Sequence, residues 1–170
     1  MKHYFSFFIF KYFHIKDKTK KQFPYHFHDF NKVILFVSGD VTYYVDGRPY
    51  ILKPGDILLV RHHCLHKPVI NPSAVYERIV IWTRPGFLES PLNYPENLGS
   101  CFGIATSAGK CLLRPESSLL KELKNDLTLL ETSMTEEGYG AGILTASYFL
   151  QFFVHLNRAY IKLDSSGFDS

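Results

Sequence analysis

The spacing of apolar residues changes once along this chain, and that change constrains the fold more than any other feature. Up to residue 90, short apolar runs alternate with turn residues. The segment "DVTYYVDGRPYIL" has two such runs around Asp46-Gly47, a dipeptide that tolerates the positive φ angles of a tight hairpin. Pro54-Gly55 precede another run at Ile57–Val60, and "VYERIVIW" (75–82) is a further one. Several short strands separated by turns predict a β-sandwich or β-barrel.

Beyond residue 113 the apolar residues follow a helical period. In "PESSLLKELKNDLTLLETSM" Pro115 suits the first turn of a helix. One face of that helix is predicted to carry Leu119, Leu120, Leu123, Leu127 and Leu130. The segment "ILTASYFLQFFVHLNRAYIKL" (143–163) predicts a second helix that is apolar on several faces. We expect it to be buried against the β region and the first helix, or also against another subunit.

The composition fits one domain in a reducing compartment. The chain has 170 residues and a net charge of +3, which is too small to indicate nucleic-acid binding. Its cysteines are odd in number and form no CxxC pair, which favours the cytosol: Cys64, Cys101 and Cys111. No segment approaches the roughly 20 apolar residues that span a membrane. The opening "MKHYFSFFIFKYFH" is interpreted as a strand, because its apolar run is short for a signal peptide.

Two histidines one residue apart, His26 and His28, precede a nearly unbroken apolar run. In an extended chain both side chains point to the same side. A turn at "DFN" (29–31) would place Lys32 on the next strand, beside the histidines. From there the alternation predicts one face with Lys32, Ile34 and Phe36 and an opposite, also apolar, face with Val33, Leu35 and Val37. Both faces should therefore be covered, and the C-terminal helices could cover the outer one.

These residues resemble the two motifs of the cupin superfamily. The first motif has His-x-His, a Glu and a Gly, and here reads His26, His28, Lys32 and Gly39, so lysine stands in the Glu position. The second motif ends in a histidine, which corresponds to His66. The longer stretch from "HFHDFNKVILFVSGD" to "YERIVIWTRPGFLE", followed by a loop and two helices, resembles the N-terminal effector-binding and dimerisation domain of AraC-type bacterial transcription regulators.

The resemblance implies a mainly β fold with C-terminal helices, namely a cupin-like double-stranded β-helix (jelly roll) followed by an antiparallel helix pair. Residues 1–90 would form the barrel, 91–113 a connecting segment with little regular structure, and 114–163 the helical region. In the family a DNA-binding domain follows, so 164–170 is expected to be a linker towards a domain absent from this chain. DNA would be bound only through that domain.

The implied function is the sensing of a small-molecule effector, a sugar or another small metabolite, by a cytoplasmic bacterial regulator. We expect no enzyme activity, no cofactor and no membrane association. The effector would bind in the barrel mouth. The candidate ligand-binding residues are His26, His28, Lys32, Phe36, His66 and Trp82.

Two alternatives concern the histidines and the lysine. His26, His28 and His66 could hold a divalent transition metal, and the chain would then be a small metal-dependent cupin enzyme, an isomerase or a dioxygenase. Lys32 opposes this interpretation, because an ammonium repels a cation. Lys32 itself could anchor a carboxylate, phosphate or hydroxyl-rich ligand, or it could leave the pocket and pair with Asp29 or Glu77.

The apolar helices lead to a further expectation, a homodimer. A large uncovered apolar patch is uncommon on a monomer, and a two-fold contact between copies of the helices would bury it. The candidate dimerisation residues are Leu119, Leu123, Leu127, Leu130 and Tyr148. A purely structural dimerisation module with a barrel filled by side chains remains a third, weaker interpretation.

Overall fold

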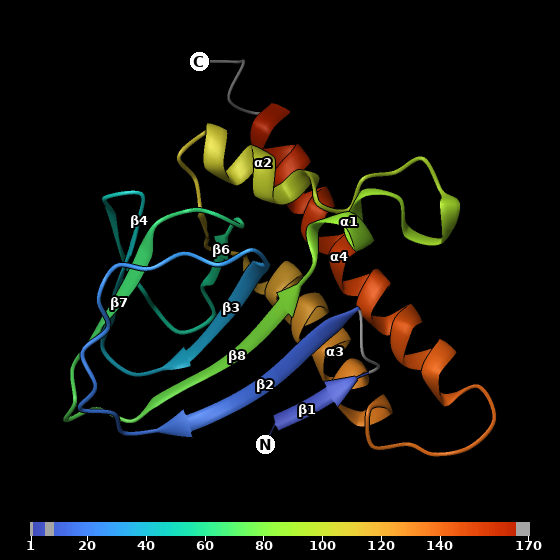
Figure 1. The fold of residues 1–170 in the computed structure, drawn as a ribbon, viewed down its shortest axis with the longest axis horizontal. Coiled ribbons are helices and arrows are strands. Elements are labelled where there is room, and N and C mark those ends of the chain that lie inside the picture. Colours follow the sequence, from blue (N-terminus) through green and yellow to red (C-terminus); the bar gives the residue numbers. More distant parts are fainter. Residues whose placement is uncertain (1, 6–8, 166–170) are drawn as a thin grey trace.

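The structure, a computed structural model, describes residues 2–5 and 9–165 (Figure 1). Its strands are β1 Lys2–Phe5, β2 Phe10–Asp17, β3 Asn31–Ser38, β4 Val41–Val45, β5 Arg48–Ile51, β6 Ile57–Val60, β7 His66–Ile70, β8 Tyr76–Thr83 and β9 Leu112–Leu113. They form one sheet with the order β1-β2-β8-β3-β6-β9 and another with the order β5-β4-β7. The cupin-like arrangement of antiparallel sheets followed by helices, expected from the sequence, is confirmed, although helices take 37% of the residues and strands 29%.

The predicted turns form as expected. Asp46 and Gly47 have φ angles of 48° and 79° and join β4 to β5 in a hairpin. The turn at Gly55, whose φ is 93°, leads into β6. There the buried Asp56 carboxylate accepts a hydrogen bond from the backbone N–H of Lys53 at 2.7 Å and two from Arg114, each at 2.8 Å. Arg114 directly follows the edge strand β9, so this ion pair connects that edge of the larger sheet to the turn before β6.

Strand β3 separates two cores, as its alternation predicts. Val33 and Leu35 belong to a cluster between the larger sheet and the helices, whereas Ile34 and Phe36 belong to a cluster inside the barrel. The inner cluster also contains Phe13, Val41, Tyr43, Val45, Leu58, Val60, Tyr76 and Val80. Because both faces of β3 are buried, the strand is fixed on both sides, and this positions the lysine at its start.

The helices are α1 Pro85–Glu89, the 3₁₀ turn η1 Pro91–Asn93, α2 Ser100–Ser107, α3 Ser117–Ser133 and α4 Ala141–Ser165. Helices α3 and α4 lie side by side on the outer face of the larger sheet (Figure 1). Helix α3 begins after Pro115, which precedes its N-cap Glu116 instead of lying in the first turn. Helix α4 extends into the linker expected at 164–170, and the remaining residues, 166–170, lie outside the described part of the chain.

The expectation of little regular structure at 91–113 is wrong, because the segment contains α2 and β9. Cys101, Phe102 and Ala105 are buried at helical spacing, and Phe102 packs on Phe153 of α4 with ring centroids 6.3 Å apart. The backbone N–H of Cys101 donates to Asn157 Oδ1 at 2.9 Å. The glycines and serines around this short stripe hid its period in the sequence.

The leucine stripe of α3 has a different role from the predicted one. Leu123, Leu127 and Leu130 are at most 2% exposed within a single chain and belong to the core between the helices and the sheet. Leu119 and Tyr148 are partly buried against the same core. The three buried leucines therefore cannot face a second copy, and assigning them to a dimer interface was wrong. They pack instead against the larger sheet and α4.

Candidate functional site

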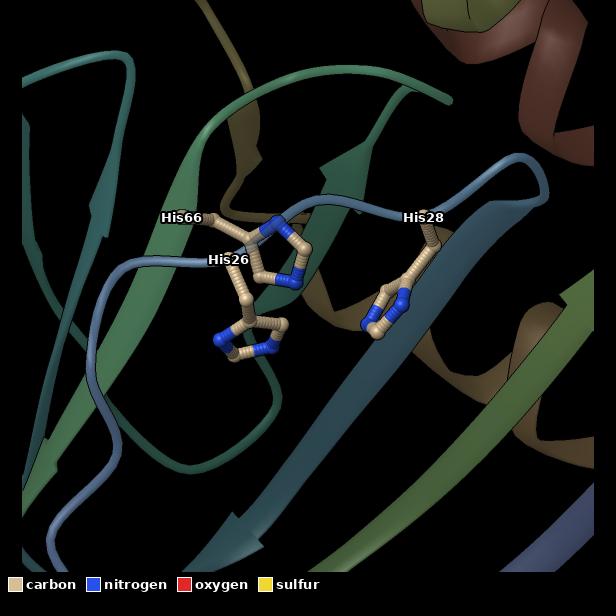
Figure 2. A group of neighbouring side chains, drawn as sticks. All are labelled: His26, His28 and His66. Atoms are coloured by element: carbon tan, nitrogen blue, oxygen red, sulfur yellow. The ribbon is translucent and has the colours of Figure 1, made fainter.

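The three motif histidines converge at one place, although they come from distant parts of the sequence. His26 and His28 lie on the segment before β3, and His66 is the first residue of β7. Two backbone hydrogen bonds join His26 to His66, at 3.0 and 2.9 Å. The three imidazoles point toward one another (Figure 2), and their candidate ligand atoms all lie within 4.8 Å.

The turn at 29–31 places Lys32 beside these rings, as the sequence predicts. Asn31 holds the turn, because its Oδ1 accepts a hydrogen bond from the backbone N–H of His62 at 2.9 Å. Lys32 Nζ lies 3.2 Å from His66 Nε2 and 3.4 Å from His28 Nε2. The alternative, in which Lys32 leaves the pocket and pairs with a carboxylate, is contradicted. Glu77 instead contacts Lys16 and His14, each at 3.0 Å.

The hydrogen bonds of the imidazoles set their orientation. His66 Nδ1 lies 2.9 Å from the carbonyl oxygen of Cys64, and His26 Nδ1 lies 2.8 Å from that of Pro24. A carbonyl accepts only, so each Nδ1 carries a proton and donates it. The Nε2 atoms of these two rings then have lone pairs, and that of His66 accepts a hydrogen bond from Lys32.

The electrostatics of the cluster agree with this arrangement. Lys32 is 7% exposed, and burial lowers the pKa of its ammonium from 10.5 to about 8. Burial, and then the charge of Lys32, lowers the pKa of His66 from 6.5 to about 3 and that of His28 from 6.5 to about 4. At neutral pH the lysine is therefore charged and these two imidazoles are neutral. Among the described residues, no carboxylate forms an ion pair with Lys32.

These residues do not fit a divalent metal, although three imidazoles alone would suit one. The ammonium of Lys32 is within hydrogen-bonding distance of two of the three candidate ligands and uses their lone pairs. A metal bound there would face a positive charge in a partly desolvated place, where repulsion is strong. The lysine in the usual carboxylate position thus takes the place of the metal as the local cation.

An aromatic wall borders the cluster. Trp82 on β8 is directly opposite Lys32 on β3 in the sheet register. Its ring stacks on Phe30 with centroids 4.5 Å apart and lies 4.7 Å from Phe13. The indole Nε1 of Trp82 is buried and has no hydrogen-bond acceptor among the described residues. A buried donor without an acceptor is costly, so this N–H is a candidate for a contact with a ligand.

The sequence interpretation placed one residue too close to the site and missed another. Phe36 is 1% exposed and forms part of the inner core further along β3, where its ring is tilted against that of Tyr76 with centroids 5.9 Å apart. Phe30, which was not a candidate, stacks on His28 at 4.4 Å as well as on Trp82. Its position inside the turn between the histidines and the lysine was the available signal.

Comparison with protein families matches residues 12–153 to the AraC-like ligand binding domain, which is more than half of the chain. The chain belongs to this family. The comparison with curated protein sequences found no match to this chain. Within residues 2–5 and 9–165, none of its helices has the length and apolar character needed to cross a membrane.

Among solved structures, the AraC-like domain is similar to several cupins. One is a cupin-like protein from Thermotoga maritima, with 20% identity and a TM-score of 0.40 over 45% of this chain and 59% of that chain. An RmlC-like cupin from Methanocaldococcus jannaschii has 19% identity and a TM-score of 0.41, over 49% of this chain and 81% of that one. A polyketide cyclase from Streptomyces resistomycificus has 19% identity and a TM-score of 0.40, over 45% and 55%.

Proposed function

We propose that this AraC-like domain is the effector-sensing part of a bacterial transcription regulator, and that a small-molecule effector binds at the cluster of His26, His28, Lys32 and His66. Membership of a ligand-binding family supports the binding of a small molecule. The observation that carries the choice of site is the buried ammonium of Lys32, which is held by two imidazoles and, within residues 2–5 and 9–165, by no carboxylate.

The charge at this position is difficult to explain by folding alone. Burying an ammonium costs free energy unless an opposite charge compensates it, and apolar residues of the inner cluster surround the site. A charged side chain that the fold does not need is more readily explained by a ligand. His26 and His28 are partly exposed, whereas Lys32 and His66 are buried, so a ligand would approach Lys32 past the two motif histidines.

The connection between the site and the helices supports a sensing role. On β8, Trp82 faces the site and its neighbour Ile81 belongs to the core under the helices. On β3, Lys32 faces the site and its neighbour Val33 belongs to the core under the helices. A ligand that shifts either strand therefore acts on the packing of α3 and α4. For such a shift to occur, the effector must bind the two arrangements with different free energies.

Association of two copies, which the family resemblance implies, would need a surface other than the leucine stripe. On α4, Ile143 is 76% exposed and Ile161 is 53% exposed. They are 18 residues apart, about five helical turns, and so lie on the same face. A dimer through the helices would therefore use this face of α4.

The alternative of a metal-dependent cupin enzyme is favoured by one observation, the three imidazoles within 4.8 Å. The position of Lys32 argues against it, because the ammonium already occupies two of the three lone pairs. We therefore propose a binding protein and not an enzyme. Elemental analysis of the purified protein distinguishes the two, since the enzyme requires stoichiometric metal and the sensor does not.

A ligand screen tests the sensing function. The purified chain is mixed with chemically diverse small metabolites, including sugars, polyols, amino acids and organic acids, and its unfolding temperature is measured. Stabilisation by one class, lost in Lys32→Met but kept in Lys124→Met on the exposed face of α3, supports the proposal. Stabilisation that survives Lys32→Met would place the effector elsewhere. A helix-turn-helix pair encoded after Ser170 in the gene would support the regulatory part.

A further inference from the structure

The hydrogen-bonding capacity of the cluster indicates which class of ligand it accepts. Lys32 has three N–H donors and directs two of them at His28 and His66, which leaves one. Trp82 adds the buried indole N–H that has no acceptor. Both donors belong to residues paired directly across β3 and β8, and such pairs lie side by side on one face of the sheet. Among the described residues, these two donors therefore lack acceptors.

We propose that the effector is a small organic carboxylate with an apolar body, whose two oxygens accept hydrogen bonds from Lys32 Nζ and Trp82 Nε1. This inference rests on the proposed effector-binding role of the same site. His28 connects the two donors, because its Nε2 lies 3.4 Å from Lys32 Nζ and its ring centroid lies 6.3 Å from that of Trp82. The rings of Phe30 and Trp82 supply the apolar surface for the rest of the ligand.

Polyols and phosphates match these groups less well. A polyol brings several O–H donors, whereas the Nε2 atoms of His28 and His66 already accept from Lys32. A phosphate group carries up to about two negative charges and three acceptor oxygens at neutral pH. The buried ammonium of Lys32 balances one negative charge, whereas Lys11, whose Nζ lies 5.8 Å from the centroid of the Trp82 ring, is exposed to solvent. A carboxylate has one charge and two oxygens, and so matches both the charge and the two donors.

The chain contains one tryptophan, so its fluorescence reports directly on this site. The protein is titrated with sodium benzoate and sodium hexanoate, and in parallel with benzamide and hexanamide, which keep the body but remove the charge. We expect the carboxylates to change the Trp82 emission at concentrations at least about tenfold lower than the amides, because a charge-assisted hydrogen bond is lost in the amides. Lys32→Met should reduce this preference to less than about threefold, and Lys124→Met should leave it unchanged.

Trp82→Phe tests the second donor while retaining an aromatic ring. Since this variant lacks the fluorescent reporter, binding of benzoate is measured by calorimetry, and we expect it to weaken about fivefold or more. Equal responses to acids and amides, or no response to either carboxylate, would overturn the proposed ligand class. Stabilisation of the protein by a neutral sugar, lost in Lys32→Met, would overturn this inference while leaving the sensing function in place. If no compound in the broad screen stabilises the protein in a way that depends on Lys32, both the ligand class and the sensing function at this site are overturned.

Discussion

Replacing Lys32 by methionine is the most direct test of the charge at the site. Methionine has a similar length and no charge, so the substitution removes the buried ammonium with little change in volume. In the folded protein the pKa of Lys32 falls from 10.5 to about 8 because of burial. A difference of this size corresponds to about 3 kcal/mol of destabilisation while the amine is charged in both states.

The net effect of the substitution is smaller than this figure. The imidazoles of His28 and His66 lose a donor, and an unsatisfied buried acceptor costs about 1 kcal/mol or more. His28 is partly exposed and can turn to water, so the larger loss falls on His66, which is 1% exposed. We therefore expect Lys32→Met to stabilise the protein at pH 7 by about 1–2 kcal/mol.

The stabilisation by Lys32→Met should decrease as the pH rises. Below pH 8 both the folded and the unfolded wild-type chains keep the proton on Lys32. Between pH 8 and 10.5 the unfolded state binds more protons, so the free energy of unfolding of the wild type rises with pH. By about pH 9.5 this rise reaches about 2 kcal/mol, and the advantage of the variant should vanish. Contributions from other titrating groups are the same in both proteins and cancel in the difference.

Urea unfolding followed by Trp82 fluorescence gives these free energies at neutral and alkaline pH, with Lys124→Met as a control for removing an exposed lysine. The control should remain within about 0.5 kcal/mol of the wild type at each pH. A Lys32→Met variant that is less stable than the wild type at pH 7 by an amount that does not vary with pH would refute the reasoning. It would mean that Lys32 is solvated, or that a carboxylate neutralises it.

Three further results are expected. Wild-type protein should retain well under one divalent metal per chain after mild chelation, and stoichiometric metal would contradict this. Lys32→Glu should bind zinc much more tightly in calorimetry, because it supplies the carboxylate beside three histidines. Leu127→Ala should lower the free energy of unfolding by about 2–5 kcal/mol without changing the sedimentation coefficient, since Leu127 is 2% exposed in the core of one chain; dissociation of an oligomer would contradict it. With a net charge of +3, the chain should bind duplex DNA only weakly and lose that binding steeply with salt in a gel shift, and salt-resistant selective binding would be contrary evidence.

The sequence was sufficient where local chemistry decides the structure. Asp46-Gly47 allows a hairpin with positive φ at both positions, and the hairpin forms there. The alternation along β3 assigns Val33 and Leu35 to one core and Ile34 and Phe36 to the other, because successive side chains of a strand point to opposite faces of the sheet. The turn before Lys32 also follows from the sequence, since the lysine could not otherwise reach the histidines.

Prediction was weakest where the outcome depends on areas and on distant contacts. The face formed by Leu123, Leu127 and Leu130 is compatible with a sheet or with a second chain, and only the extent of the outer sheet surface decides between them. Helix α2 is short and rich in small residues, and it is held by Asn157 from α4. Neither the extent of a surface nor a partner 56 positions away appears in a periodic pattern.

Lys32 stands where the first cupin motif has a glutamate. This lysine changes the charge of the site as well as the number of possible metal ligands. In a site with three imidazoles and a carboxylate, the bound cation is the positive centre, and it is removable. Here the positive centre is part of the chain, and two of the imidazoles accept hydrogen bonds from it. Two donors still available to a ligand are therefore one N–H of the ammonium and the indole N–H of Trp82. With a lysine at this position the site would favour acceptors and anions, and the neighbouring aromatic rings would select those with an apolar body.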